Sequence, residues 1–135
     1  MAIIETKRAL ERHLMALTPT LPTAFEGVSF EPPSTMYQRC QLRIDTPDDS
    51  TNTSNYYRER TEFQVFIVGE SNKGSGDIIQ RAEKVRAHFP RASTLTEDGF
   101  LIHFLRTPTI GSAMVVGTRM VIPIMIEVLT EIQIL

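Results

Sequence analysis

The closing stretch of the chain, residues 119–129, is apolar on both faces when it is read as a β-strand. One face carries Met120, Ile122, Ile124, Ile126 and Val128, and the other carries Val121, Pro123, Met125 and Leu129, interrupted only by Glu127. A strand at the border of a small domain normally alternates, because one face packs on the core and the other meets water. Apolar residues on both faces need cover on both sides. The chain's own helices can cover one side and a neighbouring subunit the other, so this strand favours an assembly protein over an enzyme.

Size and charge narrow the class of protein. A chain of 135 residues suits one domain with one core, spanning residues 1–135. The formal net charge of −2 gives no electrostatic footprint for direct nucleic-acid recognition. The charged N-terminus lacks a signal-peptide core, and no apolar run approaches the roughly 20 residues of a membrane span. We therefore expect a protein made and used in a cytoplasm, without a membrane partner.

Hydrophobic periodicity predicts an alternation of helices and strands. The expected helices cover residues 3–17 and 77–89, with Ser75 as a candidate N-cap of the second, and the expected strands cover residues 25–30, 36–45, 56–69, 99–106 and 118–130. Residues 107–117 are expected to form a connecting loop with a small apolar patch. Pro123 has no N–H to donate, so its strand is expected at a sheet edge or at a bulge.

A long polar segment joins two of the expected strands. Residues 46–55 contain no large apolar side chain, and the flanking strands are expected to pair as an antiparallel hairpin. Such a loop cannot bury enough surface to offset its ordering entropy, so we expect it to be mobile in the free protein. A hairpin tip of this length favours a contact role, with Asp48, Asp49, Asn52 and Asn55 as the candidate interaction residues.

The side chains that most often perform catalysis or bind metals are scattered. His13, His88 and His103 have no partner at metal-ligand spacing, which favours surface or structural histidines. Cys40 lies on the apolar face of its expected strand without a local activating group, so a buried and inert thiol is expected.

Two loops suggest ligand chemistry but fail its spacing. Asp45, Asp48 and Asp49 do not match an EF-hand loop, since no bidentate Glu follows at the required place. Residues 69–76 lead from a strand to a helix, but Lys73 precedes Gly74 and the glycine spacing departs from a phosphate-binding loop. We therefore expect no catalytic residue, no cofactor and no metal.

Five stretches in order along the chain resemble the tail-terminator and minor-tail proteins of long-tailed bacteriophages. These are the polar hairpin tip at 47–55, the strand Phe-Gln-Val-Phe-Ile-Val at 63–68, the helix ending in His-Phe-Pro-Arg at 88–91, the run Leu-Thr-Glu-Asp-Gly-Phe at 95–100, and the closing strand with Val-Ile-Pro-Ile at 121–124. The resemblance implies a single α+β domain, in which two helices pack on a mixed or antiparallel sheet. It also implies a homo-hexameric ring that caps the tail tube, stops its polymerisation and joins it to the head.

The resemblance also implies partners and a location. The partners would be further copies of the chain, the tail-tube protein and the head-completion protein. The protein would reside in the virion tail after assembly in the cytoplasm of the bacterial host. A ring needs two different surfaces on each subunit, and the side of the last strand that carries Val121, Met125 and Leu129 is one candidate.

Two alternatives remain open at the level of the sequence. The first is another phage neck, connector or tail-tube component, which polymerisation into tubes would favour. The second is a small-ligand-binding or enzymatic α+β domain, which would show a concave pocket with converging ionisable groups.

Overall fold

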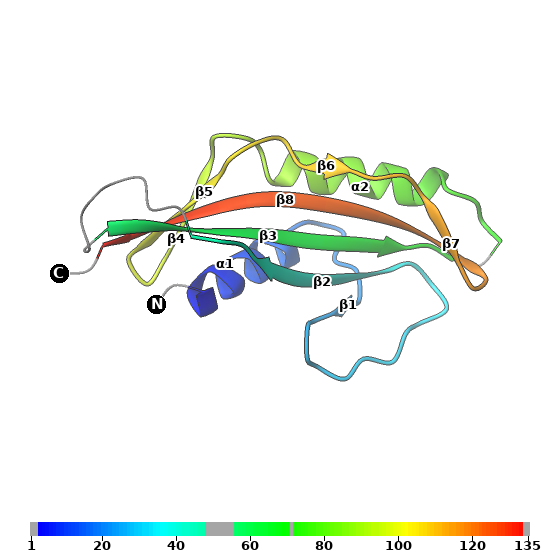
Figure 1. Cartoon of the computed structure of the whole chain (residues 1–135). Coiled ribbons are helices and arrows are strands. Elements are labelled where there is room, and N and C mark those ends of the chain that lie inside the picture. Colours follow the sequence, from blue (N-terminus) through cyan, green and yellow to red (C-terminus); the bar gives the residue numbers. More distant parts are fainter. Residues whose placement is uncertain (1–2, 48–55, 71, 134–135) are drawn as a thin grey trace.

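The computed structural model describes residues 3–47, 56–70 and 72–133 and has two helices and eight strands within them (Figure 1). The helices are α1 (Ile3–Met15) and α2 (Gly76–His88). The strands are β1 (Thr23–Ala24), β2 (Tyr37–Ile44), β3 (Tyr56–Val68), β4 (Thr94–Glu97), β5 (Phe100–Phe104), β6 (Thr109–Ile110), β7 (Met114–Val116) and β8 (Arg119–Gln133). The predicted candidates Asp48, Asp49, Asn52 and Asn55 lie outside the described residues.

The closing strand β8 forms the middle of one sheet with the order β1-β2-β3-β8-β5-β4. It pairs with the whole of β3 on one side, and with β7, β6 and β5 in turn on the other. The pair β1–β2 is parallel and the other pairs are antiparallel, so the sheet is mixed. The predicted hairpin pairing of β2 with β3 is confirmed, with Ile44 opposite Thr61 at its last described position.

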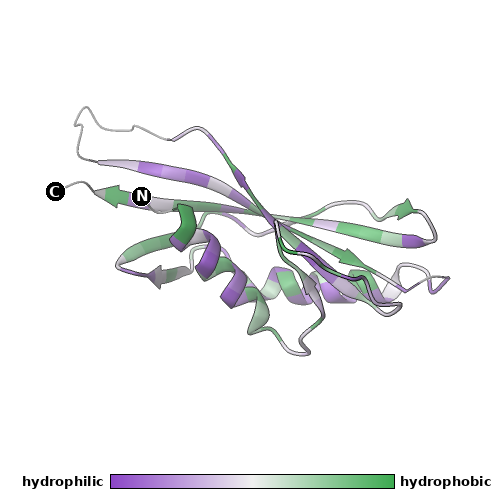
Figure 2. Cartoon of the chain, turned by 90° about the horizontal axis from the view of Figure 1, so that it is seen from below, coloured by the Kyte–Doolittle hydropathy of each residue, from purple (hydrophilic) through white to green (hydrophobic). Residues whose placement is uncertain are grey.

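Both helices lie on the same face of the sheet (Figure 2). The core that joins them to the sheet contains Leu10 and Leu14 from α1 and Ile78, Ala82 and Val85 from α2. It also contains Phe63, Val65 and Ile67 of β3 and Ile122, Ile124, Ile126 and Val128 of β8. These residues have odd numbers in β3 and even numbers in β8, and the register pairs Phe63 with Ile126, so their side chains share one face of the sheet. The fold is the expected α+β domain with two helices packed on a mixed sheet.

The C-terminal ends of the two helices meet over the middle of the sheet. His13 and His88 stack with ring centroids 4.0 Å apart. The Nε2 atom of each ring lies 2.6 Å from the other residue's backbone carbonyl oxygen, so both rings donate from Nε2. The buried Phe89 packs beneath them, with its ring centroid 4.8 Å from that of His13. The histidines therefore satisfy carbonyls that the helix ends leave open.

This pairing makes folding stability depend on pH. Burial lowers the pKa of His13 below its usual 6.5, and this effect exceeds that of the hydrogen bond to the His88 carbonyl, which raises the pKa. A group whose pKa is lower in the folded state contributes stability above its unfolded pKa and loses it as pH falls through the folded pKa. We expect the urea midpoint to decrease as pH drops below about 6.5, and this part of the decrease to disappear in His13→Gln. The control variant His103→Gln, on the other face of the sheet, should retain the full decrease of the urea midpoint. The same dependence of the midpoint on pH in the wild type and both variants would contradict the prediction.

Pro123 is accommodated within the sheet and not at its edge. The Gly111 N–H donates to the Pro123 carbonyl at 2.8 Å, so the proline nitrogen points to the same neighbouring segment. On that segment Ile110 pairs with Ile124 and Met114 pairs with Val121. Between these two pairs, residues 111–113 lie opposite only residues 122–123 of β8, so the neighbouring segment has one extra residue. A Cβ on Gly111 would lie 2.7 Å from Pro123 Cγ, so only glycine fits. Of the two predicted positions, the bulge is correct and the edge is wrong.

Short elements account for the other differences from the sequence prediction. The strand expected at 25–30 is wrong: β1 ends at Ala24 and a turn follows, in which the Val28 N–H donates to the Phe25 carbonyl. Strand β4 was not predicted, although Asp98-Gly99, both with positive φ, is the signature of a two-residue hairpin turn. The expected loop at 107–117 contains β6 and β7. Ser75 occupies the N-cap position of α2 but its side chain makes no capping hydrogen bond.

Candidate interaction surface

The second face of the sheet carries no helix within the described part of the chain. We call it the uncovered face. The register places one set of alternating residues on it: Tyr37, Arg39, Gln41 and Arg43 of β2, Arg60, Glu62, Gln64, Phe66 and Val68 of β3, and Val121, Pro123, Met125, Glu127 and Leu129 of β8. The two apolar faces predicted for β8 therefore lie in different environments. Its even-numbered face is buried under the helices, and its odd-numbered face lies on the uncovered side.

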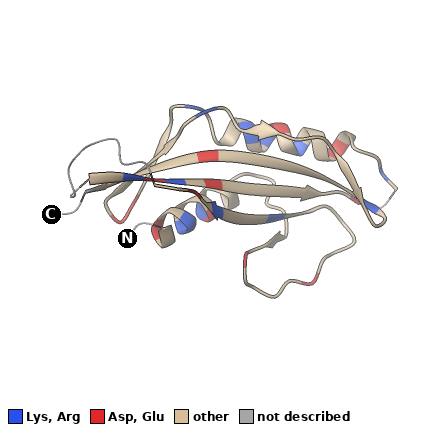
Figure 3. Ribbon diagram, viewed as in Figure 1, with Lys and Arg blue, Asp and Glu red and all other residues tan. Residues whose placement is uncertain are grey.

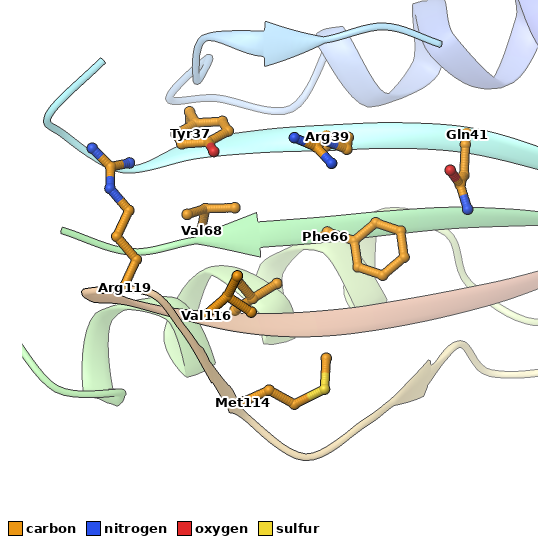
Figure 4. A pocket seen from close by; sticks show the side chains of 9 residues that line it. Tyr37, Arg39, Gln41, Phe66, Val68, Met114, Val116 and Arg119 are labelled. Carbon is orange, nitrogen blue, oxygen red and sulfur yellow. The ribbon is translucent and has the colours of Figure 1, made fainter. Parts of the chain in front are cut away.

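One half of the uncovered face is apolar and hollowed. A depression of about 360 Å³ lies between β2 and the β7–β8 hairpin (Figure 4). It is lined by Tyr37, Arg39, Gln41, Phe66, Val68, Met114, Val116, Arg119 and Val121. Six of these nine side chains are aromatic or aliphatic. An apolar depression that the chain leaves open to water is typical of a docking surface.

Arg119 ties the two walls of the depression together. Its guanidinium lies 5.3 Å from the ring centroid of Tyr37, a cation–π distance. The same group donates to the backbone carbonyls of Pro33 and Thr35. The loop before β2 is thereby fixed to the β7–β8 turn, so the depression is preformed.

The other half of the uncovered face is charged (Figure 3). Arg43 pairs with Glu62 at 3.8 Å, and Arg106 pairs with Glu127 at 3.1 Å. Further along β8, the Tyr56 hydroxyl donates to Glu131 at 2.9 Å and His103 lies 3.4 Å from the same carboxylate. The Tyr56 hydrogen bond and then His103 hold the pKa of Glu131 below its usual value. This half is a set of mutually paired ions at the surface.

The β7–β8 hairpin carries the most exposed run of apolar residues described in the chain. Met114, Val115 and Val116 are 47%, 72% and 58% exposed. Val115 pairs with Met120 and points to the helix side of the sheet, whereas its two neighbours point to the uncovered face. The sequence predicts this apolar patch within a loop, because the run is too short to show the alternation of a strand.

The three predicted residues of β8 do not share one environment. Val121 lines the depression and Met125 is partly exposed on the uncovered face. Leu129 is only 7% exposed in the chain itself, so it offers little surface to a partner. The sequence prediction omitted Tyr37, Phe66 and Arg119, which complete the depression. Only their pairing across the sheet brings these residues together.

Of the residues weighed for catalysis or ligand binding, His103 lies on the uncovered face beside Glu131, whereas Cys40 and Lys73 lie outside that face. Cys40 is fully buried, and burial raises the pKa of its thiol to about 12, so it is not nucleophilic near neutral pH. Lys73, from the loop compared with a phosphate-binding loop, pairs with Glu70 at 3.4 Å. Among the described residues, no group of three His, Cys, Asp or Glu side chains has a metal-binding arrangement.

The comparisons with known proteins decide the family. The family model for phage tail terminator protein matches residues 5–127, which is most of the chain. The chain belongs to the phage tail terminator protein family. The resemblance expected from the order of the five stretches is therefore confirmed, and the chain is a structural component of a phage tail. This family is a structural protein family and not an enzyme family.

The terminator fold is also found in a solved structure. That structure is 23% identical to this chain, with a TM-score of 0.71, and the match covers 94% of this chain and 91% of the other. At this identity the likeness supports the fold and no function. A search of curated proteins found no significant match. Among the described helices of this terminator family member, none is long and apolar enough to cross a membrane.

Proposed function

We propose that the chain forms a ring that binds the end of the phage tail tube, stops tube polymerisation and presents a surface to the head-completion protein. Membership of the terminator family supports the tail role. The observation that carries the ring is the uncovered face, where an apolar depression and the partly exposed side chains of Pro123 and Met125 lack cover within the described chain. A closed ring of identical copies would cover such a face without any other protein. The ring would assemble in the cytoplasm of the bacterial host and remain in the virion tail.

The direct test combines the purified chain with its cognate tail-tube protein. Negative-stain microscopy should show closed rings of the chain, and tubes polymerised in its presence should be shorter and should end in a ring. Tubes formed by the chain alone would instead identify a tube component. A chain that stays monomeric and leaves tube length unchanged would contradict the proposal.

We also propose that the polar segment 46–55, with Asp48, Asp49, Asn52 and Asn55, contacts the tail tube. Replacing residues 48–55 by Asn-Gly should leave folding and ring formation intact, because β3 is paired with β8 along its whole length. The same change should give headless tails or overlong tubes by electron microscopy. Tails of normal length that join heads normally would show that the segment has no contact role.

A further inference from the structure

We infer that the ring contact is made by the β7–β8 hairpin of one copy, with Val115 as its apolar anchor, seated in the depression on the uncovered face of the next copy. This inference rests on the proposed ring. It specifies which two surfaces meet, and it can fail while the ring itself is real.

The first support is the exposure of the hairpin. Val115 is 72% exposed on the helix side of the sheet, and Met114 and Val116 are 47% and 58% exposed on the uncovered side. Three consecutive exposed apolar residues on a strand are unfavourable for a free monomer, because they leave apolar surface in water and invite association. The hairpin therefore has the character of an inserting element.

The second support is the chemistry of the depression. The aromatic and aliphatic side chains of Tyr37, Phe66 and Val68 line an apolar recess. Both charged residues that line it are cations, Arg39 and Arg119. Arg119 is engaged with its own chain, whereas Arg39 is exposed and makes no side-chain hydrogen bond or ion pair within the described residues. The recess suits an apolar side chain accompanied by a carboxylate.

The third support is that a carboxylate, Glu70, lies beside the apolar side chain of Val115. Glu70 and Val115 line the same hollow on the helix side of the hairpin. Lys73 lies 3.4 Å from Glu70, but both side chains are substantially exposed, at 59% and 36%, so Glu70 can exchange this surface pair for Arg39 of a neighbour. A second copy of this chain therefore supplies both the apolar anchor and the charge that the depression lacks.

The positions of the two surfaces explain why the contact would propagate. Val115 projects on the helix side of the sheet and the depression opens on the other side. A contact between these two different patches is heterologous, so an open assembly keeps one free patch of each kind, one at each end, until it closes. A ring results when the rotation between neighbours closes on itself.

The first experiment removes the anchor. Val115→Asp should reduce ring affinity at least about tenfold, measured by mass photometry over a concentration series, without changing the circular dichroism or thermal midpoint of the monomer. The matched control is Ile4→Asp, because Ile4 is 66% exposed on α1, away from both patches, and should leave assembly unchanged. A Val115→Asp protein that forms rings like the wild type would overturn the inference and leave the ring proposal standing.

The second experiment tests which surfaces meet. A Val115→Cys, Gln41→Cys double variant treated with a short bis-maleimide should give a ladder of covalent multimers up to the ring size, because Gln41 lines the depression. The native Cys40 should not react, since it is fully buried. Each single variant should remain mostly uncrosslinked. Rings that give no ladder would overturn the inference, as would efficient dimer formation by Val115→Cys alone, which would indicate a two-fold contact. A wild-type protein that forms no ring, even on tail tubes, would instead refute the proposed function.

Discussion

Met125→Asp is expected to give a folded monomer that no longer assembles, whereas the neighbouring substitution Ile124→Asp is expected to prevent folding. Ile124 is fully buried between the sheet and the helices, and an unpaired carboxylate there costs several kcal/mol, a large part of the stability of a small domain. Met125 lies on the uncovered face and is partly exposed, so the free monomer can hydrate the new carboxylate. Burial against a neighbouring copy would remove that hydration, and assembly should fail.

Circular dichroism with light scattering separates these outcomes. The pair is well matched, because the two residues are adjacent on one strand and receive the same substitution. An unfolded Met125→Asp protein would mean that the chain itself covers this face. A Met125→Asp protein that is folded and still forms complete rings would remove Met125 from the subunit interface.

Phe89→Ala is expected to lower the free energy of unfolding by about 3–5 kcal/mol. The Phe89 ring is fully buried where the two helix ends meet the sheet, with ring centroids of Phe104 at 5.4 Å and Phe63 at 6.1 Å. Its removal leaves a cavity that contacts both helices and two strands, and these elements cannot all move inward to close it. Urea denaturation at pH 7 measures the loss.

The control for this prediction is Leu101→Ala, also a truncation of a large apolar side chain. Leu101 is 38% exposed, so the expected loss is below about 1 kcal/mol. Similar losses in the two variants would show that the junction below the two histidines is not the centre of the core. A loss in Phe89→Ala accompanied by a smaller m-value would point to a partly folded state.

Several features of this protein followed from residue order alone. The alternation in β2, the extent of β3 and the positions of both helices were predicted within a few residues. Each of these elements is long enough for its own apolar residues to show the period of a strand or a helix. The sequence also predicted that β8 has a second apolar face, since Val121, Pro123 and Met125 alternate with residues that fill the core. Cys40 was expected to be buried, because it shares the apolar parity of its strand.

Tertiary structure decided the rest. Strands β4, β6 and β7 hold four, two and three residues, too few for a period to be visible, and they exist because β5 and β8 offer them partners. The depression likewise depends on tertiary structure, because its lining joins β2 and β3 to the β7–β8 hairpin, which lies far from them in the chain. Leu129 became buried and Met125 stayed partly exposed, although both lie on one face of one strand. Local sequence determines the face on which a side chain lies. What covers that face depends on non-local packing, which no local pattern encodes.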